Sequence, residues 1–224
     1  MQCLSTATTK YYLYNVTYII LAESFWFQII PYWLDRLDRS IFLFINGKAS
    51  HPFLDALAPW WRESITWTPV YFFLLLFAII NYKKNALPWI AMALVTILLS
   101  DQISSSVVKP IFTRIRPCND PDFQQSVRLL LDGCGAGYSF TSSHATNHFA
   151  LACFLSLTLR DWIKKYAWVL YLWAASIGYA QIYTGVHYPL DVIGGALLGS
   201  FIGYVTAQVY QRYIGPLSLQ TQTV

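Results

Sequence analysis

The chain has 224 residues and a net charge of +4, and 56% of its residues are hydrophobic while only 12% are charged. Soluble domains carry about 25% charged residues, so this composition argues against an ordinary soluble domain. No basic stripe alternates with stacking aromatic residues, and we therefore expect no nucleic-acid partner. We predict an all-α, polytopic membrane bundle of about six transmembrane helices plus short interfacial helices, with a single domain over residues 1–224. A soluble helical bundle with a large core is the alternative.

The N-terminal quarter of the chain gives the least regular signal. Residues 11–33 are apolar and aromatic but contain scattered polar side chains, so this segment either crosses the bilayer or lies along its surface. The chain lacks the basic start of a signal peptide, and we expect none to be removed. Residues 34–46 place charge first and apolar residues second, which predicts an interfacial helix leading into a turn at Gly47. Residues 52–62, which include Trp60, predict a second surface segment at headgroup depth.

Several later segments are apolar enough to cross a bilayer, namely residues 66–82, 87–108, 144–159, 166–186 and 190–211. The turns between some of them, and the end of the last, are basic and contain Lys83, Lys84, Arg160, Lys164, Lys165 and Arg212. If each segment crosses once, these basic residues share one side, which the positive-inside rule makes cytoplasmic. If residues 11–33 also span, both chain ends lie inside. The last segment also has small residues at a spacing that lets a neighbouring helix approach closely, namely Gly195, Gly199 and Gly203.

Three polar clusters interrupt the apolar sequence, and the same topology places all of them on the opposite side of the membrane. They are residues 109–117, residues 142–144 and residues 185–191. Together they supply cations, hydroxyls, two imidazoles and a carboxylate. Such a set can bind a phosphate and attack its phosphorus.

The first cluster carries cations that either bind a phosphate or anchor the helix end. Lys109 and Arg116 suit phosphate oxygens, but each could instead be a snorkelling side chain. Arg114 in the same stretch is interpreted as an ordinary snorkelling residue. Pro110 should perturb the helix end between them.

The second cluster precedes a helical segment, so Ser142 or a neighbour should cap that helix. A helix N-terminus offers free N–H groups to a phosphate oxygen, although a plain cap is the alternative. Ser143 and His144 lie in the first turn, where the imidazole is either a catalyst or a histidine at headgroup level. His148, one turn further, is a weaker candidate for a supporting role.

The third cluster pairs His187 with Asp191 across Pro189, which predicts the start of the last helix. The carboxylate can accept the Nδ1–H of His187, leaving Nε2 with a free lone pair as a nucleophile toward phosphorus. A structural His–Asp pair is the alternative. The step of four between His144 and His148 could begin a metal site, but no third ligand is evident, and we expect no metal.

Residues 117–141 form the longest polar stretch, which could cap the site or gate substrate entry. Cys118 and Cys134 bracket this loop. They are a candidate disulfide if the loop faces an oxidising compartment, and two free thiols otherwise.

In this arrangement the chain resembles the type 2 phosphatidic acid phosphatase superfamily, integral-membrane lipid phosphatases related to vanadium haloperoxidases. The family pattern is Lys-x6-Arg-Pro, then Pro-Ser-Gly-His, then Ser-Arg-x5-His-x3-Asp. The first motif is complete here from Lys109 to Pro117, and the second keeps two of its four letters in residues 141–144. The third keeps His187 and Asp191. The resemblance covers roughly residues 40–212.

The resemblance implies a role for each matching residue. His187 attacks phosphorus and forms a phosphohistidine, Asp191 orients His187, and His144 protonates the leaving oxygen. Water then hydrolyses the phosphoenzyme without a metal or other cofactor. The phosphoryl oxygens are bound by Lys109, Arg116, Ser142 and backbone N–H groups that include that of Ser143.

One departure from the family pattern concerns charge. The Ser-Arg pair of the third motif is replaced by Ala180 and Gln181, so one cation is missing. A glutamine donates a weaker hydrogen bond than an arginine. We hypothesise that Arg114 or Arg128 partly compensates.

We therefore expect a metal-independent phosphatase of a lipid phosphate or pyrophosphate, with its active site on the outer, periplasmic face of a bacterial inner membrane. Its partners would be the bilayer and a lipid substrate, with undecaprenyl pyrophosphate slightly preferred over phosphatidylglycerol phosphate or phosphatidic acid. Activity should fall at both extremes of pH. Phosphoryl transfer between lipids, and a non-catalytic anion-binding membrane protein, remain alternatives. The sequence carries no signal for oligomeric state.

Overall fold

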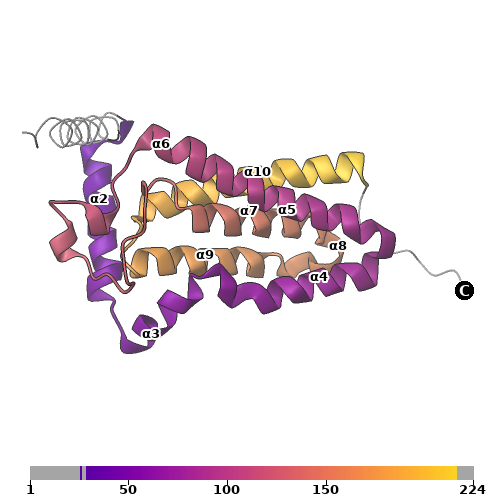
Figure 1. The fold of residues 1–224 in the computed structure, drawn as a ribbon, viewed down its shortest axis with the longest axis horizontal. Helices are drawn as coiled ribbons and strands as arrows, with labels where there is room; N and C mark the ends of the chain where they lie inside the picture. The colour runs from indigo at the N-terminus through magenta and orange to yellow at the C-terminus, as the bar shows by residue number, and fades with distance from the viewer. Residues whose placement is uncertain (1–25, 27–28, 216–224) are drawn as a thin grey trace, which may run out of the picture.

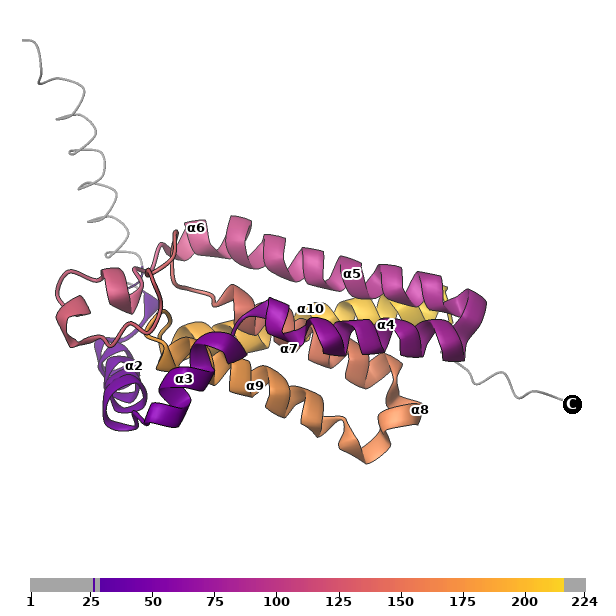
Figure 2. The same ribbon diagram turned by 60° about the horizontal axis from the view of Figure 1, so that its bottom comes forward.

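The computed structural model describes residue 26 and residues 29–215. This part of the chain is helical, with no strand. Five helices lie alongside one another and form an elongated bundle (Figures 1 and 2), namely α4 (Thr68–Tyr82), α5 (Ala86–Gln102), α7 (Ser143–Thr158), α9 (Trp168–Tyr183) and α10 (Pro189–Tyr213). The predicted all-α bundle is confirmed. The uncertain segment 11–33 lies mostly outside the described residues.

The outer surface of the bundle is apolar, as a lipid-facing surface must be. Ile80 on α4 and Leu197 and Phe201 on α10 are 69%, 70% and 65% exposed. Two helical runs are long and apolar enough to span a membrane, Ser64–Phe112, which contains α4 and α5, and Pro189–Tyr213. Apolar side chains exposed on this scale suit lipid rather than water, which disfavours the soluble alternative.

Two shorter helices cross one end of the bundle (Figure 1), α2 (Tyr32–Leu43) and α3 (Pro52–Trp61). The predicted interfacial segments are therefore helical. The turn expected at Gly47 is wrong in detail, because Gly47 lies inside a π-helical turn, Phe44–Lys48, and the chain turns after it. Trp60 on α3 is 74% exposed, which suits a residue at headgroup depth.

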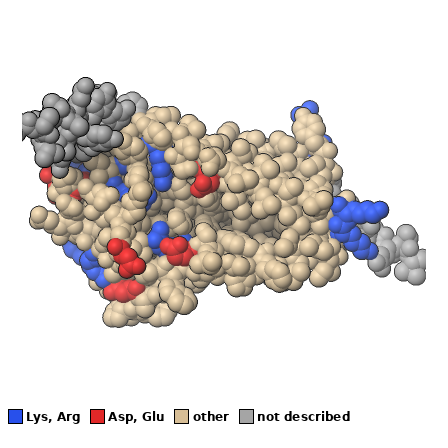
Figure 3. Space-filling view, viewed as in Figure 1, with Lys and Arg blue, Asp and Glu red and all other residues tan. Residues whose placement is uncertain are grey.

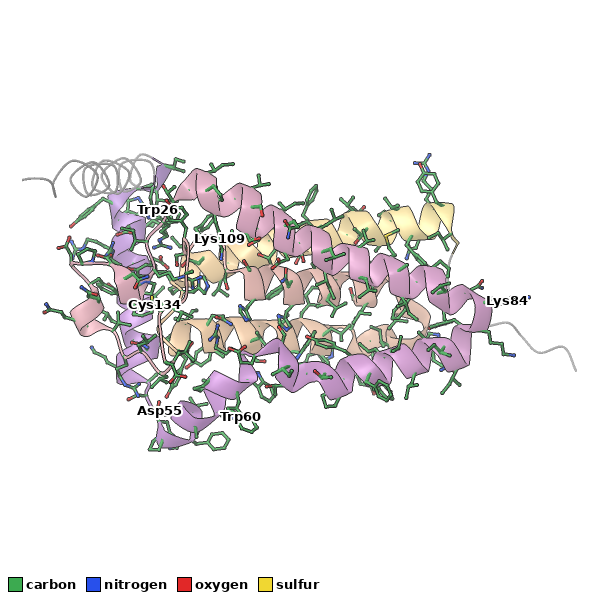
Figure 4. All side chains as sticks on the ribbon, in the orientation of Figure 1. Trp26, Asp55, Trp60, Lys84, Lys109 and Cys134 are labelled. Atoms are coloured by element: carbon green, nitrogen blue, oxygen red, sulfur yellow. A yellow bond between two sulfur atoms is a disulfide. The ribbon has the colours of Figure 1, made fainter. Side chains whose placement is uncertain are left out.

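The two ends of the bundle differ in charge. Lys84 lies at the end opposite Lys109 and Cys134 (Figure 4). Figure 3 shows the charged residues of one face gathered toward the two ends, with lysine and arginine alone at the end far from α2. The expected separation of the basic turns from the polar clusters is therefore confirmed.

The bundle core lies where α5, α7 and α10 meet. Trp89, Phe154 and Tyr210 are buried together there. Trp89 also donates a hydrogen bond to the Thr158 hydroxyl at 3.0 Å, so the indole is not left unpaired in the core.

Helices α7 and α10 pack backbone to backbone. A Cβ atom on Gly199 would lie 2.1 Å from the carbonyl oxygen of Thr146, and one on Gly203 would lie 2.2 Å from that of Ala150. One helical turn earlier, Gly195 would clash with the carbonyl oxygen of Ser142 at 2.7 Å. The packing role predicted for these glycines is confirmed, and it brings the start of α7 close to the start of α10.

The polar end of α5 is distorted as expected near Pro110. The helix widens into a π-helix over Ile103–Val108 and continues as the short helix α6 (Lys109–Phe112). Proline lacks an N–H and its ring clashes with the carbonyl four residues earlier, which accounts for the widening. Thr113 then adopts a left-handed conformation, with φ of 49°, and ends the helix.

Candidate active site

A pocket of about 180 Å³ opens at the polar end of the bundle. Segments that are distant in sequence meet around it, and Figure 4 shows two of them, at Lys109 and Cys134, lying at the same end of the bundle. Its side chains include Arg62, Lys109, Arg116, Ser143, His144 and His187. The structure therefore brings together most of the residues predicted from the three clusters.

His187 lies in the turn between α9 and α10 and is only 2% exposed. Its Nε2 lies 3.1 Å from Nη1 of Arg116. A guanidinium can only donate, so Nε2 must be the accepting nitrogen, and the proton of the neutral ring must sit on Nδ1. This is the tautomer that a nucleophilic Nε2 requires.

The other ring nitrogen of His187 faces two oxygens. Nδ1 is 3.4 Å from the hydroxyl of Ser139 and 3.5 Å from Oδ2 of Asp191. Ser139 in turn donates a hydrogen bond to the same carboxylate oxygen. The expected contact between His187 and Asp191 is present, although its 3.5 Å distance is long for a hydrogen bond. The hydroxyl of Ser139 contacts both side chains.

Asp191 is fully buried in the first turn of α10 and is held from several sides. The N–H of Tyr188 donates to Oδ2 at 2.8 Å, and Nη1 of Arg114 donates to Oδ1 at 2.7 Å. The carboxylate is therefore charge-compensated and fixed in direction before any substrate binds.

The interpretation of Arg114 as a snorkelling residue is wrong. Its side chain is 4% exposed and bridges Asp191 to Asp38 on α2. Its guanidinium carbon lies 4.0 Å from the ring centre of Trp26 and 4.1 Å from that of Tyr188. Burial alone would lower the pKa of Arg114, but the two carboxylates outweigh it and raise that pKa. A cation committed to this cluster cannot also serve the pocket.

Arg128 does not compensate for Gln181 either. It forms an ion pair with Asp55 on α3 at 2.8 Å and donates to the backbone oxygen of Asn46 at 2.7 Å. Both compensating arginines proposed from the sequence are therefore committed to other partners.

Arg116 is buried but has no carboxylate partner among the described residues. Besides His187, its donors contact the carbonyl oxygens of Val186, Gly137 and Ala136 at 3.3 to 3.4 Å. Burial lowers the pKa of Arg116, and the nearby charge of Arg62 acts in the same direction, although Asp191 opposes both. Such a guanidinium retains a strong attraction for an anion.

Burial also determines the charge of His187. It lowers the pKa of the imidazole to about 4, and the charges of Arg116 and Lys109 act in the same direction, while Asp191 opposes them. The ring is therefore neutral at physiological pH, as nucleophilic attack requires.

The residues of the second cluster divide between the pocket and the helix cap. Ser142 is buried, and its hydroxyl accepts from the N–H of Ala145 at 3.5 Å as the cap of α7, while Ser143 and His144 line the pocket. His148 is outside the pocket. Its Nδ1 bonds to the carbonyl oxygen of His144 at 2.7 Å, and its Nε2 faces the hydroxyl of Tyr71.

The polar loop also contributes to the pocket. Cys118 and Cys134 are joined by a disulfide, with a Cα–Cα distance of 5.7 Å. Cys134 and its two glycine neighbours form part of the pocket wall. The candidate disulfide is therefore present. The loop lies at the pocket, as both capping and gating require.

Several residues of the site gave no signal in the sequence. Ser139 and Asp38 act on Asp191 directly or through Arg114, and Arg62 lines the pocket. Asp38 and Arg62 lie in segments expected at the membrane surface, and Ser139 lies in the polar stretch 117–141. No fixed spacing connects any of them to the three clusters. Their positions depend on how the loop and α2–α3 pack against the bundle.

The chain is similar in sequence to known lipid phosphatases. The chain is 36% identical over 187 residues to the lipid A 4′-phosphatase of Porphyromonas gingivalis, covering 80% of this chain and 77% of that protein. It is 32% identical to the undecaprenyl-diphosphatase of Sulfolobus acidocaldarius, covering 68% of this chain and 67% of that protein.

The fold has also been seen before. The crystal structure of a transmembrane PAP2-type phosphatidylglycerolphosphate phosphatase from Bacillus subtilis matches with a TM-score of 0.62 and 18% identity, covering 88% of this chain and 96% of that one. The family model described as the PAP2 superfamily matches residues 90–214, which contain all three polar clusters. The chain belongs to the PAP2 superfamily.

Proposed function

We propose that this membrane protein hydrolyses a phosphate ester or diphosphate of a lipid, with His187 as the nucleophile. One observation supports this most strongly. The neutral His187 turns an accepting Nε2 toward Arg116 at 3.1 Å, in a pocket that also contains Lys109 and Arg62. A nucleophile within a cluster of cations suits a phosphoryl group, which is negatively charged and attacked at its centre.

The reaction follows from these positions. A bound phosphate attracts Arg116 from Nε2 to a phosphoryl oxygen, which frees the lone pair. Nε2 then forms a bond to phosphorus as the bond to the lipid oxygen breaks, and His144 protonates the departing oxygen. His144, now without that proton, takes one from the water that attacks the phosphohistidine. The N–P bond then breaks, Nε2 regains its lone pair and inorganic phosphate leaves. Asp191 and Ser139 bind the Nδ1–H and stabilise the charge that the ring acquires.

The phosphoryl oxygens are bound by Lys109, Arg116 and the start of α7. Ser143 offers its N–H and hydroxyl there, and Ser142 contributes by capping the helix and fixing its first turn. A helix N-terminus at the pocket adds N–H donors and a partial positive charge.

The active site is proposed to face the periplasm from a bacterial inner membrane, within one domain over residues 1–224. The basic turns at the other end favour a cytoplasmic location for that end. A disulfide in the wall of the pocket favours an oxidising compartment for this one.

The relatives suggest two substrate classes. The match to the lipid A 4′-phosphatase is longer and has higher identity than the match to the undecaprenyl-diphosphatase. We therefore propose a lipid A-type phosphomonoester as the first substrate and undecaprenyl pyrophosphate as the second.

Phosphate release by purified protein in detergent with EDTA tests the proposal. Lipid A, undecaprenyl pyrophosphate, phosphatidylglycerol phosphate and phosphatidic acid are compared at equal surface concentration. We expect release from at least one of them, lost in His187→Ala. No release from any lipid would favour the anion-binding alternative, and phosphate recovered on a second lipid would favour phosphoryl transfer.

A further inference from the structure

We propose that Arg62 is a third phosphate-binding cation of the pocket and that Gln181 positions it. This proposal rests on the proposed phosphatase function and adds a residue that lies outside the three polar clusters. Arg62 follows the last residue of α3, whereas the residues of those clusters come from α6 and the loop after it, the start of α7, and the turn that leads into the start of α10.

The geometry directs Arg62 into the pocket. Its Nε donates to Oε1 of Gln181 at 3.2 Å, and its backbone N–H bonds to the carbonyl oxygen of Ala58 as α3 ends. The first contact holds the guanidinium against α9 and the second anchors the backbone of Arg62. Arg62 lines the same pocket as His187.

Pairing with aspartate distinguishes the pocket cations from three other arginines at this end. Arg39, Arg114 and Arg128 each form an ion pair with at least one aspartate. By contrast, the described lining of the pocket contains Arg62, Lys109 and Arg116 and no carboxylate.

The charge of Arg62 is only weakly compensated. Its ion-pair partner among the described residues is Glu63, whose side chain is 49% exposed, and such surface pairs are weak. Burial lowers the pKa of Arg62, whereas Glu63 acts against this. Concentrated positive charge of this kind suits an anion with more than one negative charge, such as a phosphate monoester.

Gln181 is suited to hold Arg62. It is fully buried in α9, six residues before His187, and its carbonyl oxygen accepts from Arg62. This bond fixes the orientation of the amide, and Nε2 then has no hydrogen-bond partner in the described structure. A buried donor without a partner costs free energy. The arrangement is therefore better explained by the need to place Arg62 than by the stability of Gln181.

The charge of Arg62 also accounts for the neutral residue at position 181. An arginine at position 181 would put two guanidinium groups next to each other and away from water, at a high electrostatic cost. Glutamine avoids the repulsion and still accepts a hydrogen bond. The cation missing from α9 is thus supplied by α3.

Four variants test whether Arg62 supplies the cation that is absent at position 181. They are Arg62→Ala, Gln181→Arg, the double variant Arg62→Ala/Gln181→Arg, and the control Arg36→Ala. Arg36 is an exposed arginine of α2 outside the pocket, so its loss removes the same charge from the same end. Each protein is purified whole in detergent. Two quantities are measured: kcat/KM for the lipid phosphate that the wild type hydrolyses best, and the inhibition constant of inorganic phosphate.

We expect Arg62→Ala to lower kcat/KM by about 100-fold, the size typical of a lost electrostatic contact to the transition state. Phosphate inhibition should weaken about tenfold in the same protein, because a binding contact is lost. The double variant should recover most of both losses, whereas Gln181→Arg alone should be impaired by repulsion. Arg36→Ala should match the wild type.

The outcomes separate this proposal from the proposed function. A wild type that releases phosphate, together with Arg62→Ala retaining normal phosphate inhibition, would overturn the role of Arg62 and leave the function intact. A wild type without turnover would instead refute the function. If Arg62→Ala is poorly folded by thermal denaturation, Arg62→Gln provides the same comparison, and unchanged phosphate inhibition there would again overturn the proposal.

Discussion

The hydrogen bond between Arg116 and His187 engages Nε2, the atom that we propose attacks phosphorus. The lone pair of Nε2 is engaged at 3.1 Å, so the ring is held in its reactive tautomer but shielded. An arriving phosphate competes for the guanidinium, because a charge-assisted bond to phosphate is stronger than one to a neutral imidazole. In the proposed mechanism, Arg116 therefore couples phosphate binding to release of the Nε2 lone pair of His187.

The low pKa of His187 predicts an acid limb at unusually low pH. Burial lowers the pKa of His187 to about 4, from 6.5 for an ordinary histidine, so the ring stays neutral and nucleophilic down to about that pH. As the pH falls through that value, protonation of Nε2 removes the lone pair and kcat/KM should drop. A kcat/KM profile from pH 3 to 9 measures this. An acid limb centred near 6.5 would contradict the buried, neutral state.

Ser139 offers a second test at the residue scale. Its hydroxyl lies between His187 and Asp191, so Ser139→Ala should loosen the ring and lower kcat by about 10- to 100-fold, the size of one hydrogen bond to a charged group. KM should change little, because the hydroxyl does not line the pocket. Steady-state kinetics measure kcat and KM separately. The matched control is Ser126→Ala, an exposed serine of the same loop, and equal kinetics for both variants would refute the role of Ser139.

The sequence predicts a site residue only when fixed spacing links it to a motif. His187 and Asp191 are four apart at a helix start, so their proximity follows from local geometry. Ser139 and Arg62 reach the same site from a loop and from the end of α3, where tertiary packing decides the position. Arg114 was misinterpreted for the same reason, since its partner Asp38 is 76 residues away.

Helices were more predictable than their ends. The apolar segments correspond to α4, α5, α7, α9 and α10, because a bilayer demands long apolar runs. The π-helix at residues 103–108 and the one containing Gly47 were not foreseen as such, since hydrophobic patterning does not distinguish them from α-helix. The start of α10 at Pro189 was foreseen, because proline has a strong preference for that position.

The close packing of α7 and α10 gives a prediction at this scale. Gly199→Ala would place a methyl group 2.1 Å from the carbonyl oxygen of Thr146, and backbone atoms cannot yield as a flexible side chain can. The helices must separate, which also strains the bond from the N–H of Ser142 to the carbonyl oxygen of Asp191.

We expect Gly199→Ala to lose about 1–3 kcal/mol of stability, the usual cost of overpacking, and to lose activity as the two clusters separate. Thermal denaturation in detergent and phosphate release measure the two effects. Gly47→Ala is the control, since the added methyl group would meet no described atom within 4 Å apart from its chain neighbours and its own helical backbone. Equal unfolding temperatures for the two variants would show that Gly199 and the carbonyl oxygen of Thr146 are not tightly packed.

At the scale of the whole molecule, the fold places the candidate active-site residues at one end of the bundle and the basic residues of the turns at the other. Lys84 and Arg212 lie in or beside the turns far from the pocket, while the disulfide loop covers the pocket end. Helices that each cross once bring distant clusters to one depth. This is why the convergence could be predicted from the sequence even though the individual contacts could not.

This polarity predicts which end a water-soluble reagent can reach. Gln125→Cys places a thiol on the exposed loop at the pocket end, and Lys84→Cys places one at the basic end. A membrane-impermeant maleimide should label Gln125→Cys in intact bacteria with a permeabilised outer membrane, because we propose that this end faces the periplasm. It should label Lys84→Cys only after the inner membrane is broken.

The parent protein shows the background from its own cysteines, of which Cys153 is buried. Labelling of Lys84→Cys in intact cells, with Gln125→Cys protected, would reverse the orientation and place the active site in the cytoplasm, where the disulfide would not be expected to persist.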